Sequence, residues 1–233
     1  MASPVVRTNP VHERLRADVL AVGAPYALVL AGGDAVRAHG LVDRLTEGVD
    51  VATEHPAGMP EIVAGVRAGL EERGWTVTVV EADPLGARLL AGDPATGTEC
   101  RADLRKEALW RPPVETAAGP TLSLEDLVGT TVRALAGRGL PRDLIDVHAA
   151  ARRWSRPDLE ELGRRHAPDT FDLVDLQSRL TGTDWLDDAE FRAHGIDQPT
   201  ADEIRRWAQE WADDIAERLL EGGDPPEDLV ETD

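Results

Sequence analysis

Residues 30–53 read LAGGDAVRAHGLVDRLTEGVDVAT, the stretch of the chain that says most about its fold. An apolar strand leads into a turn made by Gly32 and Gly33, and a second apolar strand follows that carries one acid, Asp50. A strand, a glycine turn and a carboxylate on the next strand begin several phosphate-handling sites, because glycine amides approach a phosphate without obstruction. Such sites normally have another carboxylate two residues earlier, where this chain has Gly48.

The composition is that of a globular protein with a large excess of acids. Of its 233 residues, 42% are hydrophobic, and 44 acids against 25 bases give a formal net charge of -19. Proteins that bind nucleic acids usually present a basic surface, so this charge disfavours a nucleic-acid partner, although a local basic patch is compatible with it. No apolar run reaches the length of about 18 residues that spans a bilayer. The chain shows no secretory signal and has a single cysteine, Cys100. We expect a cytoplasmic protein without membrane contact.

Hydrophobic periodicity divides the chain into an α+β part and a helical part. In the first part it predicts the strands 26–32, 49–53, 75–81, 87–91 and 98–104 and the helices 11–22, 34–40 and 59–74. Beyond a loop rich in proline and glycine, 111–122, it predicts the helices 123–137, 141–154, 155–166, 171–180 and 201–220. We therefore assign 1–118 to a mixed-sheet domain, 119–221 to a helical domain and 222–233 to an acidic flexible tail.

Strand parity places two acids on corresponding faces. Side chains two residues apart share a face of a strand, so Val49 and Val51 point into the core while Asp50 points away from it. On the strand 98–104 the same parity directs Asp103 outward. If these strands are neighbours, Asp50 and Asp103 meet, and two carboxylates at one spot bind Mg²⁺ together with substrate phosphates. The simpler interpretation, in which both acids are merely solvated, is also open at this point.

The quoted stretch resembles the opening motif of the minimal nucleotidyltransferases of the DNA polymerase β-like superfamily. The likeness is closest to the AbiEii/AbiGii-type nucleotidyltransferase toxins, and it extends over about residues 20–180. Residues 60–81 are similar to the helix and strand that follow in the family, CRADL at 100–104 falls where a further acid is expected, and 122–162 is similar to the helical half. The resemblance implies a nucleotidyltransferase-like mixed-sheet domain followed by a C-terminal helical domain.

The family implies an activity and a set of site residues. The resemblance implies that a nucleoside monophosphate passes from a nucleoside triphosphate to a hydroxyl acceptor, with a pair of Mg²⁺ ions as the cofactor. Matched motif by motif, the catalytic and metal-binding carboxylates are Asp50 and Asp103. The matched nucleotide-binding residues are Gly32, Gly33, Arg44, Thr46 and Arg142. An antitoxin protein is an implied partner, and RNA, protein and small molecules are all open as acceptors.

The chain departs from the family pattern at two positions. The first family carboxylate falls on Gly48, and a phosphate-binding lysine of many relatives falls on Thr131. Arginine binds phosphate well through its planar fork, so the lysine can be replaced by Arg133, Arg138 or Arg142. Glu47 lies next to the missing carboxylate, but its parity is wrong unless the strand bulges.

The missing carboxylate leaves three interpretations open. The chain is an active nucleotidyltransferase, a degenerate relative that binds nucleotide without turnover, or a structural protein. Under the first interpretation, aspartate in place of Gly48 is expected to raise Mg²⁺-dependent activity. Arg142 also has a simpler interpretation, as the surface partner of Asp146 one helical turn away.

Overall fold

A computed structural model describes residues 9–44, 46 and 48–221, so the expectations for Glu47 and for the tail at 222–233 lie outside the described residues. The strands of the described part form one mixed seven-stranded sheet in the order β3-β4-β5-β2-β1-β7-β6. Their bounds are β1 Val29–Leu30, β2 Gly48–Thr53, β3 Thr76–Ala82, β4 Gly86–Asp93, β5 Thr98–Lys106, β6 Val114–Thr116 and β7 Gly119–Thr121. The expected α+β class, a mixed sheet followed by helices, is confirmed.

The middle of the sheet fixes the position of both candidate carboxylates. β2 and β5 run parallel, with Gly48 opposite Arg101 and Asp50 opposite Asp103. On the other side of β5, the antiparallel strand β4 places Arg88 opposite Asp103. The alternating pattern of β2 and β5 buries their apolar residues in the core, as expected. The expected neighbourhood of these strands is therefore observed.

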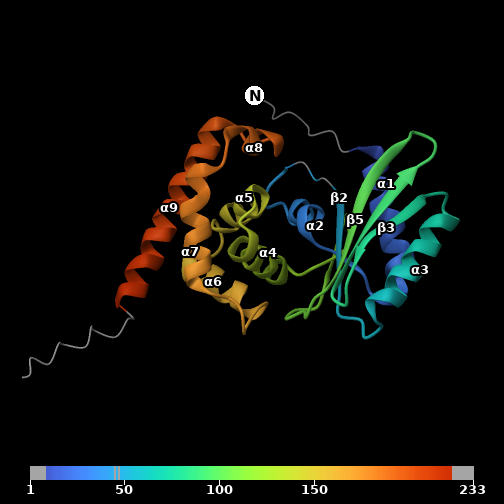
Figure 1. Ribbon diagram of the computed structural model, residues 1–233, viewed down its shortest axis with the longest axis horizontal. Helices are drawn as coiled ribbons and strands as arrows, with labels where there is room; N and C mark the ends of the chain where they lie inside the picture. The colour runs from blue at the N-terminus through green and yellow to red at the C-terminus, as the bar shows by residue number, and fades with distance from the viewer. Residues whose placement is uncertain (1–8, 45, 47, 222–233) are drawn as a thin grey trace, which may run out of the picture.

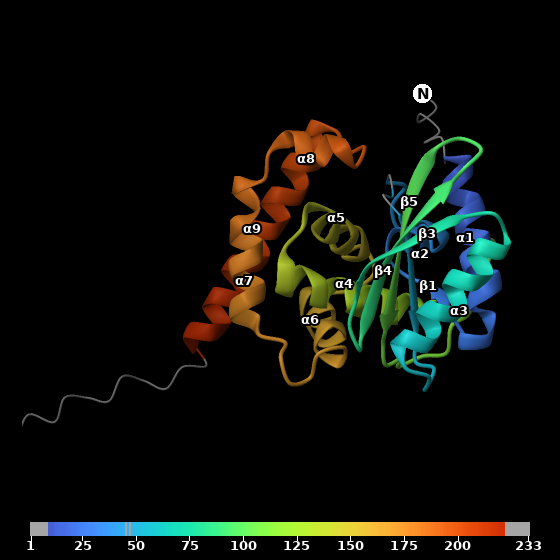
Figure 2. The same ribbon diagram turned by 45° about the vertical axis from the view of Figure 1, so that its right-hand side comes forward.

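Two helices cover one face of the sheet. α1, Pro10–Gly23, and α3, Met59–Glu72, pack against each other and lie together on the side of the sheet away from the other helices (Figures 1 and 2). Both are amphipathic and place their apolar residues in the core below the sheet; these are Leu15, Val19, Ile62, Val66 and Leu70. The short helix α2, Gly32–Ala38, follows β1 directly and contacts β2.

The C-terminal half is helical, as expected. Its helices are α4 Leu124–Arg138, α5 Pro141–Ala150, α6 Arg156–Arg165, α7 Leu173–Thr181, α8 Asp188–Ala193 and α9 Gln198–Glu221. Side-chain caps set four of the starts, those of α4, α6, α7 and α8; at α4, Ser123 accepts a hydrogen bond from the Asp126 amide, and at α6, Ser155 forms a capping box with Asp158. These helices enclose a second core that is separate from the core under the sheet.

The segment 111–122, expected to be a loop, contains the short strands β6 and β7, and that expectation is wrong. β7 pairs in parallel with β1 through Leu30 and Thr121, so the sheet continues past residue 118. The two cores divide within α4, between Leu127 and Val128. Among the described residues, no helix has the length and apolar character needed to cross a bilayer.

Candidate active site

A cavity of about 300 Å³ lies between the sheet and the helical half. The sheet side contributes the β1–α2 turn and residues of β2, β4 and β5, and the other wall comes from α4, α5 and the end of α8. The charged residues that line it are Arg44, Arg88, Arg101, Arg105, Arg133, Arg138 and Arg142, with Asp50, Asp103, Glu107, Asp143 and Asp146. Among the described residues that line the cavity, seven arginines against five acids give a net positive charge, whereas the whole chain carries -19.

Asp50 and Asp103 lie side by side in this cavity. They are register partners on adjacent parallel strands and project on the same face. Burial raises the pKa of Asp50 to about 6, and the negative charge of Asp103 adds to the effect, while Arg101 and Arg142 oppose it. Near pH 7 the Asp50 carboxylate is therefore ionised but poorly solvated. Such a group gains from any cation that reaches it.

The Gly32–Gly33 turn lies directly over the Asp50 carboxylate. Gly32 has φ +51°, and a β-carbon there would lie 2.4 Å from Oδ2 of Asp50. A β-carbon at Gly33 would lie 2.3 Å from Cγ2 of Thr46. Both glycines are thus required by close packing, and at Gly32 also by the left-handed backbone. Sequence reasoning placed these residues together correctly, while their contact with a nucleotide stays a prediction.

Asp103 is held by two arginines. Nε of Arg88 donates to Oδ1 over 2.8 Å, and Nε of Arg101 lies 2.9 Å from Oδ2 in an ion pair. Asp103 is almost fully buried, so its charge is compensated within the protein. Asp103 projects on the cavity face of β5, away from the core, as the alternation predicted, but the role of both arginines was missed. The spacing of Arg101, two residues before Asp103, is the signal in the sequence that could have identified it. Arg88 reaches Asp103 from another strand, and no local pattern predicts that pair.

Arg44 binds a carboxylate of the helical half. Its Nε and Nη2 donate to Oδ1 and Oδ2 of Asp146 on α5, each over 2.6 Å, and both side chains are buried. Burial raises the pKa of Asp146, and the hydrogen bonds and charge of Arg44 oppose that rise. Arg44 also lies under the glycine turn, 3.2 Å from the β-carbon position of Gly33. It therefore connects the glycine turn to α5, a contact between residues 102 positions apart.

The remaining predicted residues border this contact. Thr46 packs against Gly33, and its hydroxyl lies 3.5 Å from Nε2 of His12. Arg142 lines the cavity, and its Nε lies 3.9 Å from Oδ1 of Asp143. The pair suggested for Arg142 and Asp146 does not lie at the surface, because Asp146 is buried and bound to Arg44, but the charge of Arg142 does oppose the rise in the pKa of Asp146.

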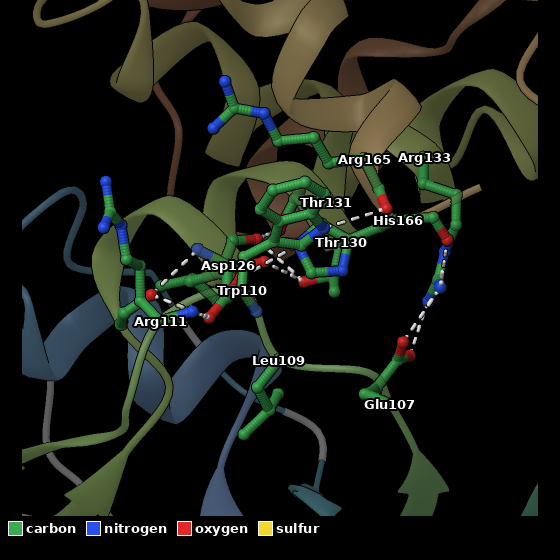
Figure 3. Close-up of polar contacts among 12 residues, drawn as sticks. Glu107, Leu109, Trp110, Arg111, Asp126, Thr130, Thr131, Arg133, Arg165 and His166 are labelled. Carbon is green, nitrogen blue, oxygen red and sulfur yellow. Dashed lines mark hydrogen bonds and ion pairs between the residues drawn. The ribbon is translucent and has the colours of Figure 1, made fainter. Parts of the chain in front are cut away.

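The segment between β5 and β6 is fastened to the helical half (Figure 3). The Asp126 carboxylate accepts hydrogen bonds from the amides of Trp110 and Arg111, both over 3.0 Å. Nε2 of His166 lies 3.1 Å from Oδ1 of the same carboxylate. Arg133 binds Glu107 through both nitrogens of its fork at the adjacent edge of the cavity (Figure 3). These contacts fix how the two walls of the cavity face each other.

Position 48 is closed to a side chain. A β-carbon on Gly48 would lie 2.6 Å from the carbonyl oxygen and 2.9 Å from Cβ of Arg101. An obstacle that includes backbone cannot move cheaply, so aspartate in place of Gly48 would displace the β5 strand rather than complete a metal site. The expectation that this substitution raises activity is therefore not supported by the structure.

The donor set fits one Mg²⁺ and not a pair. Asp50 and Asp103 offer two carboxylates on one face of the sheet, which together with phosphate oxygens and water suits a single Mg²⁺. Within the described residues, no group of three or more His, Cys, Asp or Glu side chains is arranged to hold a metal. Gly48 offers no side-chain carboxylate for a second ion.

The fold recurs in solved structures of bacterial proteins. Helicobacter pylori JHP933 has a TM-score of 0.51 and 18% identity, over 91% of this chain and 94% of its own. The nucleotidyltransferase toxin MenT4 of Mycobacterium tuberculosis has a TM-score of 0.55 and 15% identity, over 88% of this chain and 83% of its own. At these identities the likeness concerns the fold. No curated protein sequence matches the chain.

A family model establishes what the fold alone does not. The model described as nucleotidyl transferase AbiEii toxin, type IV TA (toxin–antitoxin) system, matches residues 15–227, which include both halves and the whole cavity. The chain therefore belongs to the AbiEii family of nucleotidyltransferase toxins.

Proposed function

We propose that the cavity binds a nucleoside triphosphate and transfers its nucleoside monophosphate to a hydroxyl group of an acceptor. The observation that carries the proposal is a net positive cavity, built around Asp50 and Asp103, in a protein of strongly negative charge. A triphosphate is a polyanion, and an otherwise acidic protein can hold it only where cations converge. Family membership makes a nucleotide the expected polyanion.

The residues divide into two proposed roles. Arg138 and Arg142 face the cavity from α4 and α5 and bind the phosphates, replacing the lysine that the family pattern has at Thr131. Asp50 and Asp103 hold one Mg²⁺, which supplies charge neutralisation at the reacting phosphate. The acceptor hydroxyl oxygen bonds to the α-phosphorus and gives up its proton to water, the bond from the α-phosphorus to the α–β bridging oxygen breaks, and pyrophosphate leaves. Arg44 and Thr46 support the glycine turn from below and act by positioning it.

An antitoxin protein is proposed as the partner of the chain on the strength of the family description. The acceptor is proposed to be one of three classes: RNA, protein or a small molecule. These classes separate readily after a reaction with labelled triphosphate, so one experiment identifies the acceptor as well.

A second function is favoured by a specific observation. Gly48 provides no carboxylate, and both oxygens of Asp103 are engaged by arginines. A relative that binds triphosphate without turnover, and acts through binding, fits this arrangement. The two functions differ in whether label is transferred, while both require the nucleotide to bind.

The test is transfer of α-labelled nucleotide from each of the four triphosphates to a cell extract, separated into RNA, protein and small molecules. We expect Mg²⁺-dependent labelling of one fraction by the natural chain and its loss in Asp50→Ala and Asp103→Ala. Labelling that both variants retain would contradict the site assignment. Binding without any labelling would favour the second function.

A further inference from the structure

Arg101 is the one arginine of the cavity that the strand register places directly beside both the missing carboxylate and a present one. It faces Gly48 across β2 and β5, and it lies two residues before Asp103 on the same face of β5. The four positions 48, 50, 101 and 103 therefore form a rectangle on two adjacent strands. At one corner of this rectangle Gly48 has no side chain, and the position opposite it carries the guanidinium of Arg101.

Position 48 is closed to a side chain by the strand beside it. The β-carbon position of Gly48 falls within 3 Å of the carbonyl oxygen and Cβ of Arg101, atoms that any residue other than glycine has at position 101. This corner therefore holds no carboxylate, and the residue opposite it in the register, Arg101, brings a positive charge instead.

The charge of Arg101 acts on both carboxylates of the site. The Arg101 guanidinium pairs with Oδ2 of Asp103 at 2.9 Å, and its charge also favours the ionised form of Asp50. Arg88 binds the remaining oxygen of Asp103. Two carboxylates are consequently matched by two arginines before any divalent ion arrives. Arginine keeps its charge at every accessible pH, so this compensation is permanent.

We propose that Arg101 is a built-in cation that takes the place of a second divalent ion, so that the site accepts one such ion and holds it weakly without nucleotide. The guanidinium competes with the ion for Asp103 and, being fixed to β5, remains near the phosphates when a triphosphate is bound. Arg101 thereby determines the metal requirement of the site. This inference deepens the proposed function and rests on it only where it concerns the triphosphate.

A metal titration tests the inference without any nucleotide. Mn²⁺ replaces Mg²⁺ as the probe, because electron paramagnetic resonance measures its free concentration. For the natural chain we expect at most one weakly bound Mn²⁺. Arg101→Gln should bind Mn²⁺ at least about tenfold more tightly, since a neighbouring opposite charge changes the cation affinity of a carboxylate by one to three powers of ten. The double variant Arg101→Gln with Asp50→Asn should lose this gain, which locates the ion.

Two matched variants separate a local effect from a general one. Arg105→Gln removes the same charge from the same cavity and the same strand, two residues beyond Asp103, and should change the Mn²⁺ affinity by less than about threefold. Arg101→Lys keeps the charge and should behave like the natural chain. Equal Mn²⁺ affinity in the natural chain and Arg101→Gln would overturn the inference, as would two tightly bound Mn²⁺ per natural chain. Thermal unfolding verifies that each variant is folded. If Arg101→Gln does not fold, the number of Mn²⁺ ions that the natural chain binds decides the inference.

A nucleotide titration distinguishes failure of the inference from failure of the proposed function. The titration uses the triphosphate that binds best, once with Mg²⁺ and once with EDTA in its place. The ratio of the two dissociation constants, EDTA over Mg²⁺, should be at least about fivefold smaller for the natural chain than for Arg101→Gln. Equal ratios would overturn the inference while the proposed function stands. No binding of any triphosphate by the natural chain would contradict the proposed function, whereas the Mn²⁺ result would still decide the role of Arg101.

Discussion

Asp50 combines two demands that oppose each other. The proposed Mg²⁺ site requires Asp50 to be ionised, yet Asp50 lies under the Gly32–Gly33 turn in a place that disfavours its charge. The pKa of about 6 expresses this conflict, since burial and Asp103 together hold the proton on the carboxylate well above its usual range. Residues that serve a site in this way commonly reduce the stability of the fold.

The first prediction follows from the direction of this pKa shift. A carboxyl whose pKa is raised by folding favours the folded state at low pH, and that contribution is lost as pH rises through about 6. Asp50→Asn removes the ionisable group, so we expect the free energy of unfolding at pH 8 to increase, by on the order of 1–3 kcal/mol. The gain should shrink as pH falls below 6 toward 4. Urea unfolding at pH 8 and pH 5 measures it, and a loss of stability at pH 8 would contradict this view of Asp50.

The second prediction concerns Gly32, for which Gly40 is a natural control. Both have positive φ, +51° and +65°, but only the β-carbon position of Gly32 is occupied, by the Asp50 carboxylate, while Gly40 has nothing within 4 Å. Gly40→Ala should cost about 1 kcal/mol through backbone strain alone. Gly32→Ala should cost at least about 2 kcal/mol more, because it adds overlap with the half-buried Asp50 side chain. Denaturant unfolding measures the stability cost of both substitutions, and equal costs would show that the glycine turn is not in close contact with Asp50.

The elements that meet at the cavity are joined by buried charge. Arg44 follows α2 and Asp146 lies on α5, so their two hydrogen bonds connect the sheet half to the helical half. Arg44 was expected from the sequence to bind nucleotide; the structure shows what else it binds. Its contact with the glycine turn makes it a positioning residue that couples α5 to the wall above Asp50.

The third prediction tests this connection by a double-mutant cycle. Arg44→Ala and Asp146→Ala each leave a buried charge without its partner and should cost about 3–5 kcal/mol. The double variant should cost at least about 2 kcal/mol less than the sum of the two. Arg67→Ala, which breaks the exposed pair with Glu71 on α3, should cost less than about 1 kcal/mol. Additive losses in unfolding experiments on the cycle would show that Arg44 and Asp146 act independently.

Local patterns in the sequence predicted most elements, while pairing between distant segments required the structure. Alternation on 98–104 was sufficient to direct Asp103 outward, because parity depends on neighbouring residues only. The hairpin of β6 and β7 escaped notice, since three-residue strands within RPPVETAAGPTL are too short to alternate and are rich in turn residues. Arg44–Asp146 and Arg88–Asp103 join residues far apart in sequence, and no local pattern contains them.

At the scale of the whole molecule, the net positive charge of the cavity contrasts with the net negative charge of the chain. The chain is strongly acidic, yet its cavity has more arginines than acids and faces inward between two halves. The acidic exterior repels polyanions, while the cavity attracts a small one that can enter it. A small phosphorylated ligand is thus favoured over an extended nucleic-acid surface, in agreement with the charge argument made from composition. An RNA acceptor would need to present only its end to the cavity.

The fourth prediction is a dependence of nucleotide binding on salt. Salt should screen the proposed contacts between the cavity arginines and the phosphates, because the Debye length falls from about 10 Å at 0.1 M salt to about 3 Å at 1 M. Raising KCl from 0.05 to 0.5 M should weaken triphosphate binding by about tenfold or more. Fluorescence titration with a labelled nucleotide measures this change. An affinity that does not respond to salt would indicate that the arginines do not hold the phosphates.

The most direct measurement of the central claim is a calorimetric titration of the chain with each of the four triphosphates in Mg²⁺. We predict one binding site per chain for at least one triphosphate, weakened at least about tenfold in Arg142→Gln and in Asp50→Ala. Arg67→Gln, which removes an arginine from the surface of α3, should bind as the natural chain does. Absence of binding by all four triphosphates, or equal binding by Arg142→Gln and the natural chain, would contradict the assignment of this cavity as a nucleotide site.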